Sequence, residues 1–165
     1  MKCPKCGQNT LTLKYQIKNI PEIGEELFLI LECKNCGFTF TSVYPMKYGK
    51  PKKIVFKVET EEDLDVYVVK YRTAKLILEE VGIEITPSTL SKTTITTIEG
   101  LIDEVKTNLK NMKIFFDEEK RKQIDNIIDY LEKVGKGKKL TIIIEDMDGL
   151  SKIYSRKAKE SLLQQ

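Results

Sequence analysis

The stretches Cys3-Pro4-Lys5-Cys6-Gly7 and Cys33-Lys34-Asn35-Cys36-Gly37 decide the fold of the first part of this chain. Each has the pattern C-x-x-C-G, and together they contain all 4 cysteines of the sequence. Cysteines at this spacing in a tight turn can direct both thiolates at one point, and the following glycine supplies the positive φ that the turn needs. Two such knuckles side by side would offer four sulfurs at the corners of a tetrahedron, which is the arrangement that zinc prefers.

Cys3, Cys6, Cys33 and Cys36 are therefore predicted to bind one structural zinc ion. Iron in a rubredoxin-like site is the alternative metal, because thiolate ligands and tetrahedral geometry suit both ions. A pair of disulfides is the alternative without metal. No signal peptide precedes Met1, so we expect a cytoplasmic protein, in which disulfides would not persist. With four protein ligands the metal would stabilise the fold and leave no position for a substrate.

The composition is that of a soluble globular protein. Of the 165 residues, 41% are hydrophobic and 32% are charged, which is ordinary for such proteins. The net charge of +3 is the small difference between 28 basic and 25 acidic residues, so the balance does not indicate a dedicated nucleic-acid-binding protein. No apolar run approaches the roughly 20 residues that span a bilayer, and we expect no membrane association.

Residues 1–44 are predicted to form a zinc ribbon, with strands at 11–17, 27–32 and 38–44. Apolar and polar residues alternate in the first and third of these segments, which indicates half-buried strands. Pro21 and Gly24 mark the hairpin turn between the first two strands. The returning strand would bring Cys33 back beside Cys6. So short a module has little core of its own, so the metal is expected to supply its stability.

Residues 45–155 are predicted to form a second, β-rich domain after a basic connector at 45–53. Short strands are expected at 54–58, 66–71, 76–78, 83–85, 140–144 and 152–154. Between them, apolar residues recur at helical spacing, which predicts an inserted helical hairpin at 97–134. Short strands with frequent turn signals indicate a sandwich, a barrel or a jelly-roll-like domain. The charged and then Gln-rich residues 156–165 are expected to be a frayed tail.

Two helix caps are predicted within the hairpin. Thr96, with Glu99 three positions later, has the pattern of a capping box, in which each side chain satisfies a free backbone N–H of the first turn. Asp117 is expected to cap the second helix, because aspartate is a favoured residue at that position.

Few residues suggest catalysis, and we expect a protein that is not an enzyme. Histidine is absent, although it is the usual proton shuttle near neutral pH. The four cysteines are assigned to the metal. Asp146 and Asp148 could begin a calcium loop, but Ser151 and Lys157 stand where that loop needs glycine and glutamate. A tight turn is therefore the favoured interpretation of this segment, and no small-molecule substrate is expected.

A lysine cluster in and after the connector leaves a second interpretation open. It comprises Lys47, Lys50, Lys52 and Lys53, with Tyr44 and Tyr48 interleaved. Lysines beside exposed aromatic residues can follow a phosphate backbone and stack bases, so a nucleic-acid-binding ribbon protein of translation or transcription is the alternative function. The structural explanation is that these lysines lie in solvated loops, which flank strands and prevent edge aggregation. The near balance of basic and acidic residues favours this explanation.

Three segments together resemble the ZPR-type zinc-finger protein family. The two C-x-x-C knuckles match in type and approximate spacing. The segment 96–102, Thr-Thr-Ile-Glu-Gly-Leu-Ile, resembles the most specific signature of the family, T-T-[IV]-E-G-L-[IL]. The segment 146–151, Asp-Met-Asp-Gly-Leu-Ser, resembles its D-P-x-G-x-S turn, with Met147 in place of the usual proline. A weaker fourth match lies at 69–74. The chain has one module, as the shorter archaeal members do, whereas eukaryotic members have two in tandem.

The resemblance implies a zinc ribbon followed by a jelly-roll-like double-stranded β-helix domain that carries the helical hairpin. It also implies a non-enzymatic function, as a binding partner and folding chaperone of translation elongation factor one alpha. The signature residues then become candidate partner contacts, namely Glu99, Gly100, Asp146, Gly149 and Ser151. Each also has a structural explanation, as a helix cap, a close approach or a turn that bonds to itself.

Overall fold

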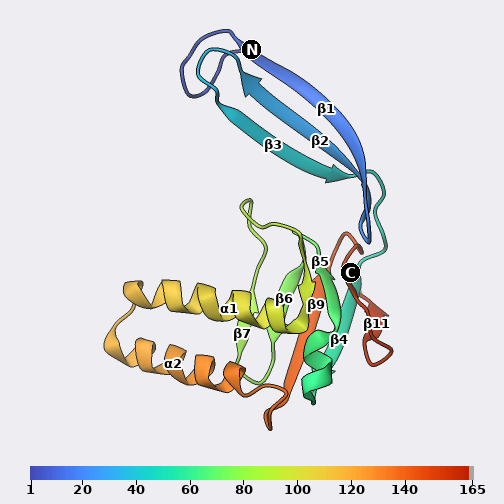
Figure 1. Cartoon of the computed structure of the whole chain (residues 1–165), viewed down its shortest axis with the longest axis vertical. Coiled ribbons are helices and arrows are strands. Elements are labelled where there is room, and N and C mark those ends of the chain that lie inside the picture. Colours follow the sequence, from blue (N-terminus) through green and yellow to red (C-terminus); the bar gives the residue numbers. More distant parts are fainter. Residues whose placement is uncertain (164–165) are drawn as a thin grey trace. The chain divides into compact units, whose positions relative to one another are not determined.

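The structure is a computed structural model, and it describes residues 1–163. The chain separates into two compact units, one comprising Met1–Tyr48 and the other the residues from Gly49 on (Figure 1). This division lies inside the basic connector 45–53, four residues after the end that the sequence predicted for the ribbon.

The first unit is a three-stranded antiparallel sheet with the order β1-β2-β3. The strands are β1 (Leu11–Ile20), β2 (Gly24–Cys33) and β3 (Thr39–Pro45). The hairpin register places Leu11 opposite Cys33, so the second knuckle returns to the first as the sequence predicted. Leu31 and Phe38 pack against the buried part of this unit around the cysteines, and its core is small. The unit is therefore a zinc-ribbon fold.

The second unit contains two antiparallel sheets, with the orders β10-β5-β8 and β11-β4-β9-β6-β7. Their strands are β4 (Lys52–Val58), β5 (Tyr67–Lys70), β6 (Lys75–Leu78), β7 (Ile83–Ile85), β8 (Thr94–Thr97), β9 (Leu140–Asp146), β10 (Lys152–Ile153) and β11 (Lys159–Leu162). Strand β9 follows the helices in sequence and pairs between β4 and β6. This crossing connection places the helical hairpin as an insertion in the sheet domain.

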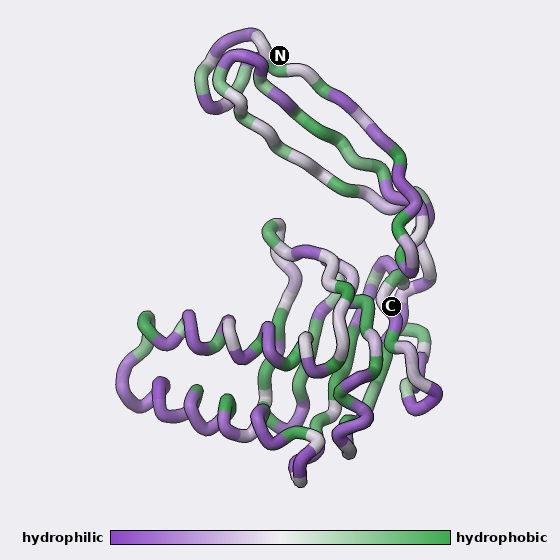
Figure 2. Tube along the Cα trace, in the orientation of Figure 1, coloured by the Kyte–Doolittle hydropathy of each residue, from purple (hydrophilic) through white to green (hydrophobic). Residues whose placement is uncertain are grey.

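The core of the second unit joins both sheets to the helices. Strand β9 is buried over Leu140–Ile144, because it lies in the middle of its sheet. Phe56 from β4, Val68 from β5 and Ile98 from α1 belong to the same buried cluster and are almost completely inaccessible. Apolar residues gather on the strands of this unit, whereas hydrophilic residues recur along the helices (Figure 2). Burial of apolar surface therefore holds the unit together.

The insertion consists of α1 (Ile98–Met112) and α2 (Glu118–Glu132), joined by the short 3-10 turn η2 (Lys113–Phe115). The two helices lie side by side (Figure 1). Asp117 caps α2 as predicted, because its carboxylate accepts the backbone N–H of Lys120 at 2.9 Å. No helix among residues 1–163 is both long and apolar enough to cross a membrane.

The predicted capping box at the start of α1 is wrong by one residue. Thr97 is the N-cap, and its hydroxyl accepts the backbone N–H of Gly100 at 3.2 Å. Thr96 instead pairs with Val68 in the sheet. The third helical position is therefore Gly100, which has no side chain to complete the box, and Glu99 is exposed in the first turn.

The predicted frayed tail at 156–165 is also wrong for most of its length. Strand β11 pairs with the edge strand β4, with Lys159 opposite Val55 and Leu162 opposite Lys52. The backbone N–H of Leu163 continues this contact to the carbonyl of Pro51 at 3.1 Å. Every residue of β11 is exposed, so backbone hydrogen bonds to β4 hold the strand in place. For the same reason the sequence of β11 shows no apolar pattern that would predict a strand. Residues 164 and 165 of the predicted tail lie outside the described residues.

Asp63 fixes the 3-10 turn η1 (Glu61–Asp65) at the end of β4. Its buried carboxylate accepts the backbone N–H groups of Glu59 at 2.8 Å and Thr60 at 3.1 Å. It also accepts the ammonium of Lys157 at 2.7 Å, which ties the C-terminal segment to this turn. Burial opposes ionisation of Asp63, but the ion pair and the two amides outweigh it and hold the pKa of this carboxyl below its usual value.

We expect Asp63→Asn to lower the free energy of unfolding of the second unit by about 1–2 kcal/mol at pH 7. The lowered folded-state pKa means that the contribution of Asp63 is complete above the unfolded-state pKa of about 3.9 and is lost as the pH falls below it. The difference in the free energy of unfolding between wild type and variant, measured by urea denaturation at each pH, should therefore stay constant from about pH 7 to pH 5 and shrink as the pH falls below about 3.9. The exposed neighbour variant Asp65→Asn is the control. A gap that stays constant with pH would contradict this role of Asp63.

Candidate metal centre

The two knuckles have the same backbone geometry. Gly7 donates its N–H to the carbonyl of Cys3 at 2.9 Å, and Gly37 donates to Cys33 at 3.0 Å. Both glycines have the positive φ that the sequence predicted, 73° and 69°. A side chain other than glycine would be strained in this left-handed conformation. The turns therefore fix where the cysteine side chains point.

The four cysteine sulfurs are grouped closely around one point. The Sγ atoms of Cys3 and Cys36 are 3.7 Å apart, and so are those of Cys6 and Cys33. All four Sγ atoms lie within 4.8 Å of one another. Four sulfurs at the usual Zn–S distance of about 2.3 Å stand about 3.8 Å apart in a tetrahedron, so the arrangement fits a zinc ion. It does not fit disulfides, whose sulfurs are bonded at about 2.05 Å.

Hydrogen-bond donors surround the sulfurs. The Thr10 hydroxyl lies 3.2 Å from Cys33 Sγ, and the backbone N–H of Lys5 lies 3.4 Å from Cys3 Sγ. The side-chain amide of Asn35 is 3.7 Å from Cys6 Sγ. The Thr10 hydroxyl is the largest cause that lowers the pKa of the Cys33 thiol to about 6, against the opposing effect of burial. Such donors stabilise thiolates and orient metal ligands. No sequence pattern marks Thr10 as part of the site, because only the pairing of β1 with β2 places it near Cys33.

The chemistry of this centre is structural. Cys3 and Cys33 are buried, whereas Cys6 and Cys36 are partly exposed at the rim. A tetrahedral ion held by four thiolates has no open coordination position, so it cannot polarise a substrate or activate water. Its contribution would be to hold the two knuckles, and through them β1 to β3, in one place.

One face of the ribbon sheet is apolar across all three strands, except at Ser42 on β3. Residues directly opposite one another in an antiparallel pair share a face. The register therefore groups Leu13, Leu31 and Phe40 in one row, Tyr15, Leu29 and Ser42 in the next, and Ile17, Leu27 and Tyr44 in the third. Leu13, Tyr15 and Ile17 are exposed by 55%, 76% and 50%. We call these nine residues the apolar ribbon face. Exposed apolar surfaces of this kind indicate binding sites.

The signature turn at 146–151 is organised by Asp146, which is completely buried. Its carboxylate accepts three backbone N–H groups, from Asp148 at 2.9 Å, Leu150 at 2.9 Å and Ser151 at 2.6 Å. The Ser151 hydroxyl, also buried, accepts the backbone N–H of Tyr71 at 2.9 Å. The turn predicted from the sequence is thus present, and it binds the segment 69–74, the weaker fourth match to the family.

Gly149 allows a second segment to approach this turn. Its φ is 67°, and a Cβ atom here would lie 2.3 Å from the carbonyl oxygen of Lys50. Gly49 donates its N–H to the carbonyl of Asp148 at 2.7 Å. Gly100 has a comparable role in α1, where a Cβ would lie 2.1 Å from the Thr96 hydroxyl. Of the five candidate partner contacts, Asp146 and Ser151 are buried, the two glycines serve close approaches, and Glu99 is exposed.

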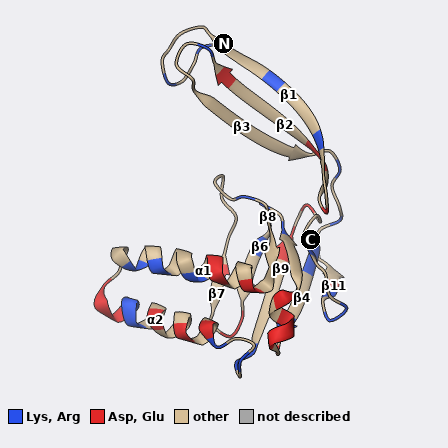
Figure 3. Ribbon diagram, in the orientation of Figure 1, with Lys and Arg blue, Asp and Glu red and all other residues tan. Residues whose placement is uncertain are grey.

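The lysine cluster is not a uniform basic surface. Lys47 belongs to the first unit, and the other three belong to the second. The Lys52 ammonium pairs with Glu160 at 3.4 Å, and Lys53 stands opposite Glu145 in the β4–β9 ladder. Both helices carry acidic as well as basic residues (Figure 3). Neighbouring carboxylates weaken attraction to a phosphate backbone, so these positions do not favour the nucleic-acid alternative.

Comparison with known proteins agrees with the fold and the site. Residues 62–164 match the ZPR1 jelly-roll domain. An uncharacterized ZPR1-like protein of Methanocaldococcus jannaschii is 30% identical over 166 residues, which cover 99% of this chain and 84% of that protein. A second one, of Pyrococcus horikoshii, is 33% identical over 167 residues, covering 98% and 75%. The zinc finger chaperone zpr1 of Schizosaccharomyces pombe is 32% identical over 164 residues, covering 96% of this chain but 35% of the yeast protein.

The matched region covers the jelly-roll unit after β4, with its helical insertion, and the alignments with the relatives extend over the four-cysteine ribbon. This sequence contains one ribbon and one jelly-roll unit, and the chain belongs to the ZPR1 family.

Proposed function

We propose that this protein is a zinc-dependent interaction factor that binds translation elongation factor one alpha and assists the folding of that GTPase. The apolar ribbon face is the observation that carries the proposal. Leu13, Tyr15 and Ile17 expose large apolar side chains in adjacent rows. A protein that binds a partner whose own apolar surface is not yet covered needs such a face, because burial of the apolar surfaces of both proteins drives their association.

The identity of the partner rests on family membership. The yeast relative is named a zinc finger chaperone, and the ZPR-type signature at 96–102 implies the elongation factor as client. This chain spans about a third of that relative's length, so the proposal is that one ribbon and one jelly-roll unit suffice for binding. A protein that acts on a translation factor would work in the cytoplasm.

The metal has a defined part in this proposal. We assign zinc to the four thiolates, where it would hold the strands that carry the apolar ribbon face. The client would then bind only the metal-loaded ribbon. No catalytic step is required, because binding and release of apolar surface are sufficient to protect a folding intermediate.

The signature residues have different proposed roles. Glu99 is exposed at the start of α1 and is the best candidate for direct contact with the partner. Asp146 and Ser151 are positioning residues, because their side chains are buried in the turn that they hold. Gly100 and Gly149 act by permitting close approaches of neighbouring segments.

We expect the double variant Leu13→Asp with Ile17→Asp to weaken binding of the elongation factor at least about tenfold, since two charges on the apolar ribbon face must be desolvated on binding. Both side chains are exposed, so the ribbon should stay folded and zinc-loaded. Biolayer interferometry with the purified, nuclease-treated factor measures the affinity, and elemental analysis measures the zinc content.

The matched control is Gln16→Asp with Thr41→Asp. It adds the same charges to the opposite face of the same sheet, at two exposed positions. Equal loss of affinity in both double variants, with zinc retained, would contradict the assignment of the apolar ribbon face. Binding that is seen only without nuclease treatment and is lost with Lys→Gln changes at Lys47, Lys50, Lys52 and Lys53 would favour the nucleic-acid alternative instead.

A further inference from the structure

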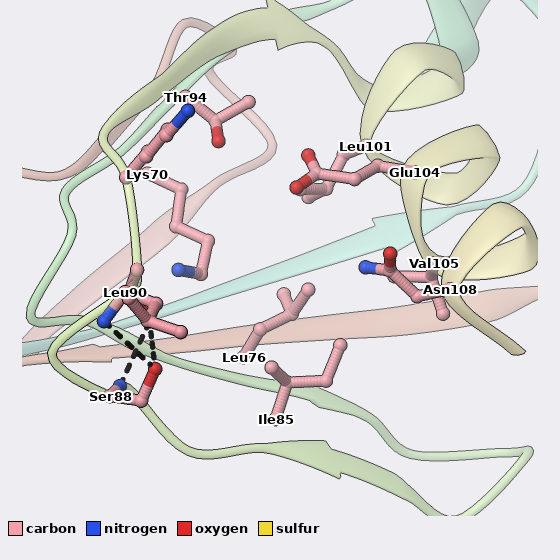
Figure 4. A pocket seen from close by; sticks show the side chains of 12 residues that line it. Lys70, Leu76, Ile85, Ser88, Leu90, Thr94, Leu101, Glu104, Val105 and Asn108 are labelled. Atoms are coloured by element: carbon pink, nitrogen blue, oxygen red, sulfur yellow. Dashed lines mark hydrogen bonds between the residues drawn. The ribbon is translucent and has the colours of Figure 1, made fainter. Parts of the chain in front are cut away.

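A cavity in the second unit is lined by helix α1, by strands of both sheets and by the loop that carries Ser88 and Ser91 (Figure 4). Its volume is about 280 Å³, at the small end of ligand pockets, which begin at about 300 Å³. Leu76 from β6 and Leu101 and Val105 from α1 form buried apolar walls. Ser88, Ser91 and Asn108 add polar groups from the loop and the helix.

Lys70 is the unusual member of this lining. The side chain comes from the end of β5, and only 9% of the residue is exposed. Figure 4 shows its ammonium pointing into the space between the strands and α1. Within residues 1–163, no hydrogen bond or ion pair to a protein group reaches this ammonium. Burial lowers the pKa of Lys70, and the more distant charges of Glu104 and Asp146 oppose that shift.

An ammonium on a mostly buried side chain is costly when no protein acceptor pairs with it, because burial removes much of its water. Lysine could be replaced here by an apolar residue if packing alone mattered. The position of its charge inside a cavity therefore indicates that an acceptor arrives from outside the chain.

The lining restricts the chemistry of that acceptor. Glu104 faces the same cavity from α1, and its negative charge disfavours a dianion such as phosphate. A single ammonium suits a monoanion. The walls of Leu76, Leu101 and Val105 suit an aliphatic group attached to it. We propose that this cavity binds a carboxylate carried on a small aliphatic body, with Lys70 as the residue that pairs with the carboxylate. The inference does not depend on the proposed elongation-factor partner.

Such a carboxylate has two possible sources, a free small acid or the C-terminal carboxylate of a polypeptide. Titration of the zinc-loaded full chain, followed by NMR, distinguishes the two sources. The lysine side chains and the methyl groups of leucine and valine carry the ¹³C label. Butyrate probes the free acid, and N-acetyl-leucine probes the polypeptide end. Butyramide and N-acetyl-leucinamide are the neutral counterparts, and inorganic phosphate tests the anion class.

We expect saturable shifts of the Lys70 side chain and of the Leu101 and Val105 methyl groups with the acids, and affinity at least about tenfold weaker for the amides. Tighter binding of N-acetyl-leucine would assign the site to a polypeptide end, and tighter binding of butyrate would assign it to a small acid. Lys70→Met should abolish the difference between acid and amide. Lys110→Met, at an exposed position of α1, should leave it unchanged.

Three results would overturn the proposal. These are the absence of a saturable Lys70 shift with either acid, equal affinity of acid and amide in the wild type, and tighter binding of phosphate than of the carboxylates. All three are measured on the wild-type protein, so the titration tests the proposal even if Lys70→Met fails to fold.

Discussion

Cys33→Ser is expected to unfold the ribbon while the jelly-roll unit stays folded. Cys33 is buried, and its sulfur forms one corner of the cluster, 3.7 Å from Cys6 Sγ. Binding of structural zinc typically contributes about 10–16 kcal/mol to the free energy of folding at pH 7. The small core of this unit cannot compensate if much of that contribution is lost. A serine hydroxyl is a poor zinc ligand, so the ion should be released.

The two units can be followed separately in this experiment. In a ¹⁵N-resolved NMR spectrum, the amide signals of residues 1–48 should collapse, and those of residues 49–163 should keep their dispersion. Lys34→Ser is the matched control, because it introduces the same residue at an exposed, non-ligating position of the same knuckle. Full zinc content in Cys33→Ser, or collapse of both units together, would contradict the separate metal-dependent ribbon.

Asp146→Ala is expected to lower the free energy of unfolding of the jelly-roll unit by about 3–5 kcal/mol, because it leaves three backbone N–H groups without an acceptor at a cost of about 1–3 kcal/mol for each buried one. The amide of Ser151 is the most deeply buried of the three. The neighbouring contact of Gly49 with Asp148 should loosen as well, since it depends on the shape of the turn.

Urea denaturation followed by circular dichroism measures this change, because the chain has no tryptophan. Asp146→Asn retains one oxygen acceptor and should cost less than Asp146→Ala. Asp129→Ala, at an exposed position of α2, should change the free energy of unfolding by less than about 0.5 kcal/mol. A change below about 1 kcal/mol in Asp146→Ala would show that the turn does not need its carboxylate.

Local chemistry made the metal centre and the turn predictable. The spacing of Cys3 and Cys6, with Gly7 after them, allows only a narrow set of backbone conformations. Asp146 stands at the end of an apolar strand and close to glycine, where an aspartate bonds to its own backbone. Within each knuckle and within the turn the interacting groups lie a few residues apart, and the second copy of the C-x-x-C-G pattern indicates that the two distant knuckles share one site.

Long-range pairing explains the errors. Thr96 has the sequence pattern of a helix cap, but the ladder with β5 retains it in β8 and moves the cap to Thr97. Strand β11 has an exposed, polar sequence, and only the free edge of β4 makes it a strand. Lys70 follows an apolar segment like any strand-ending lysine, and its burial arises from α1, which is distant in sequence. No local pattern reports these contacts.

We propose that the zinc-loaded chain binds translation elongation factor one alpha as a protein partner. Isothermal titration of the zinc-loaded chain with the purified, nuclease-treated factor tests it most directly, with the factor bound to GDP, bound to a GTP analogue and freshly diluted from denaturant. We predict saturable binding in at least one of these states and its loss when a chelator removes the zinc. The absence of binding in all three states, or equal binding after removal of zinc, would rule out a zinc-dependent complex with this factor.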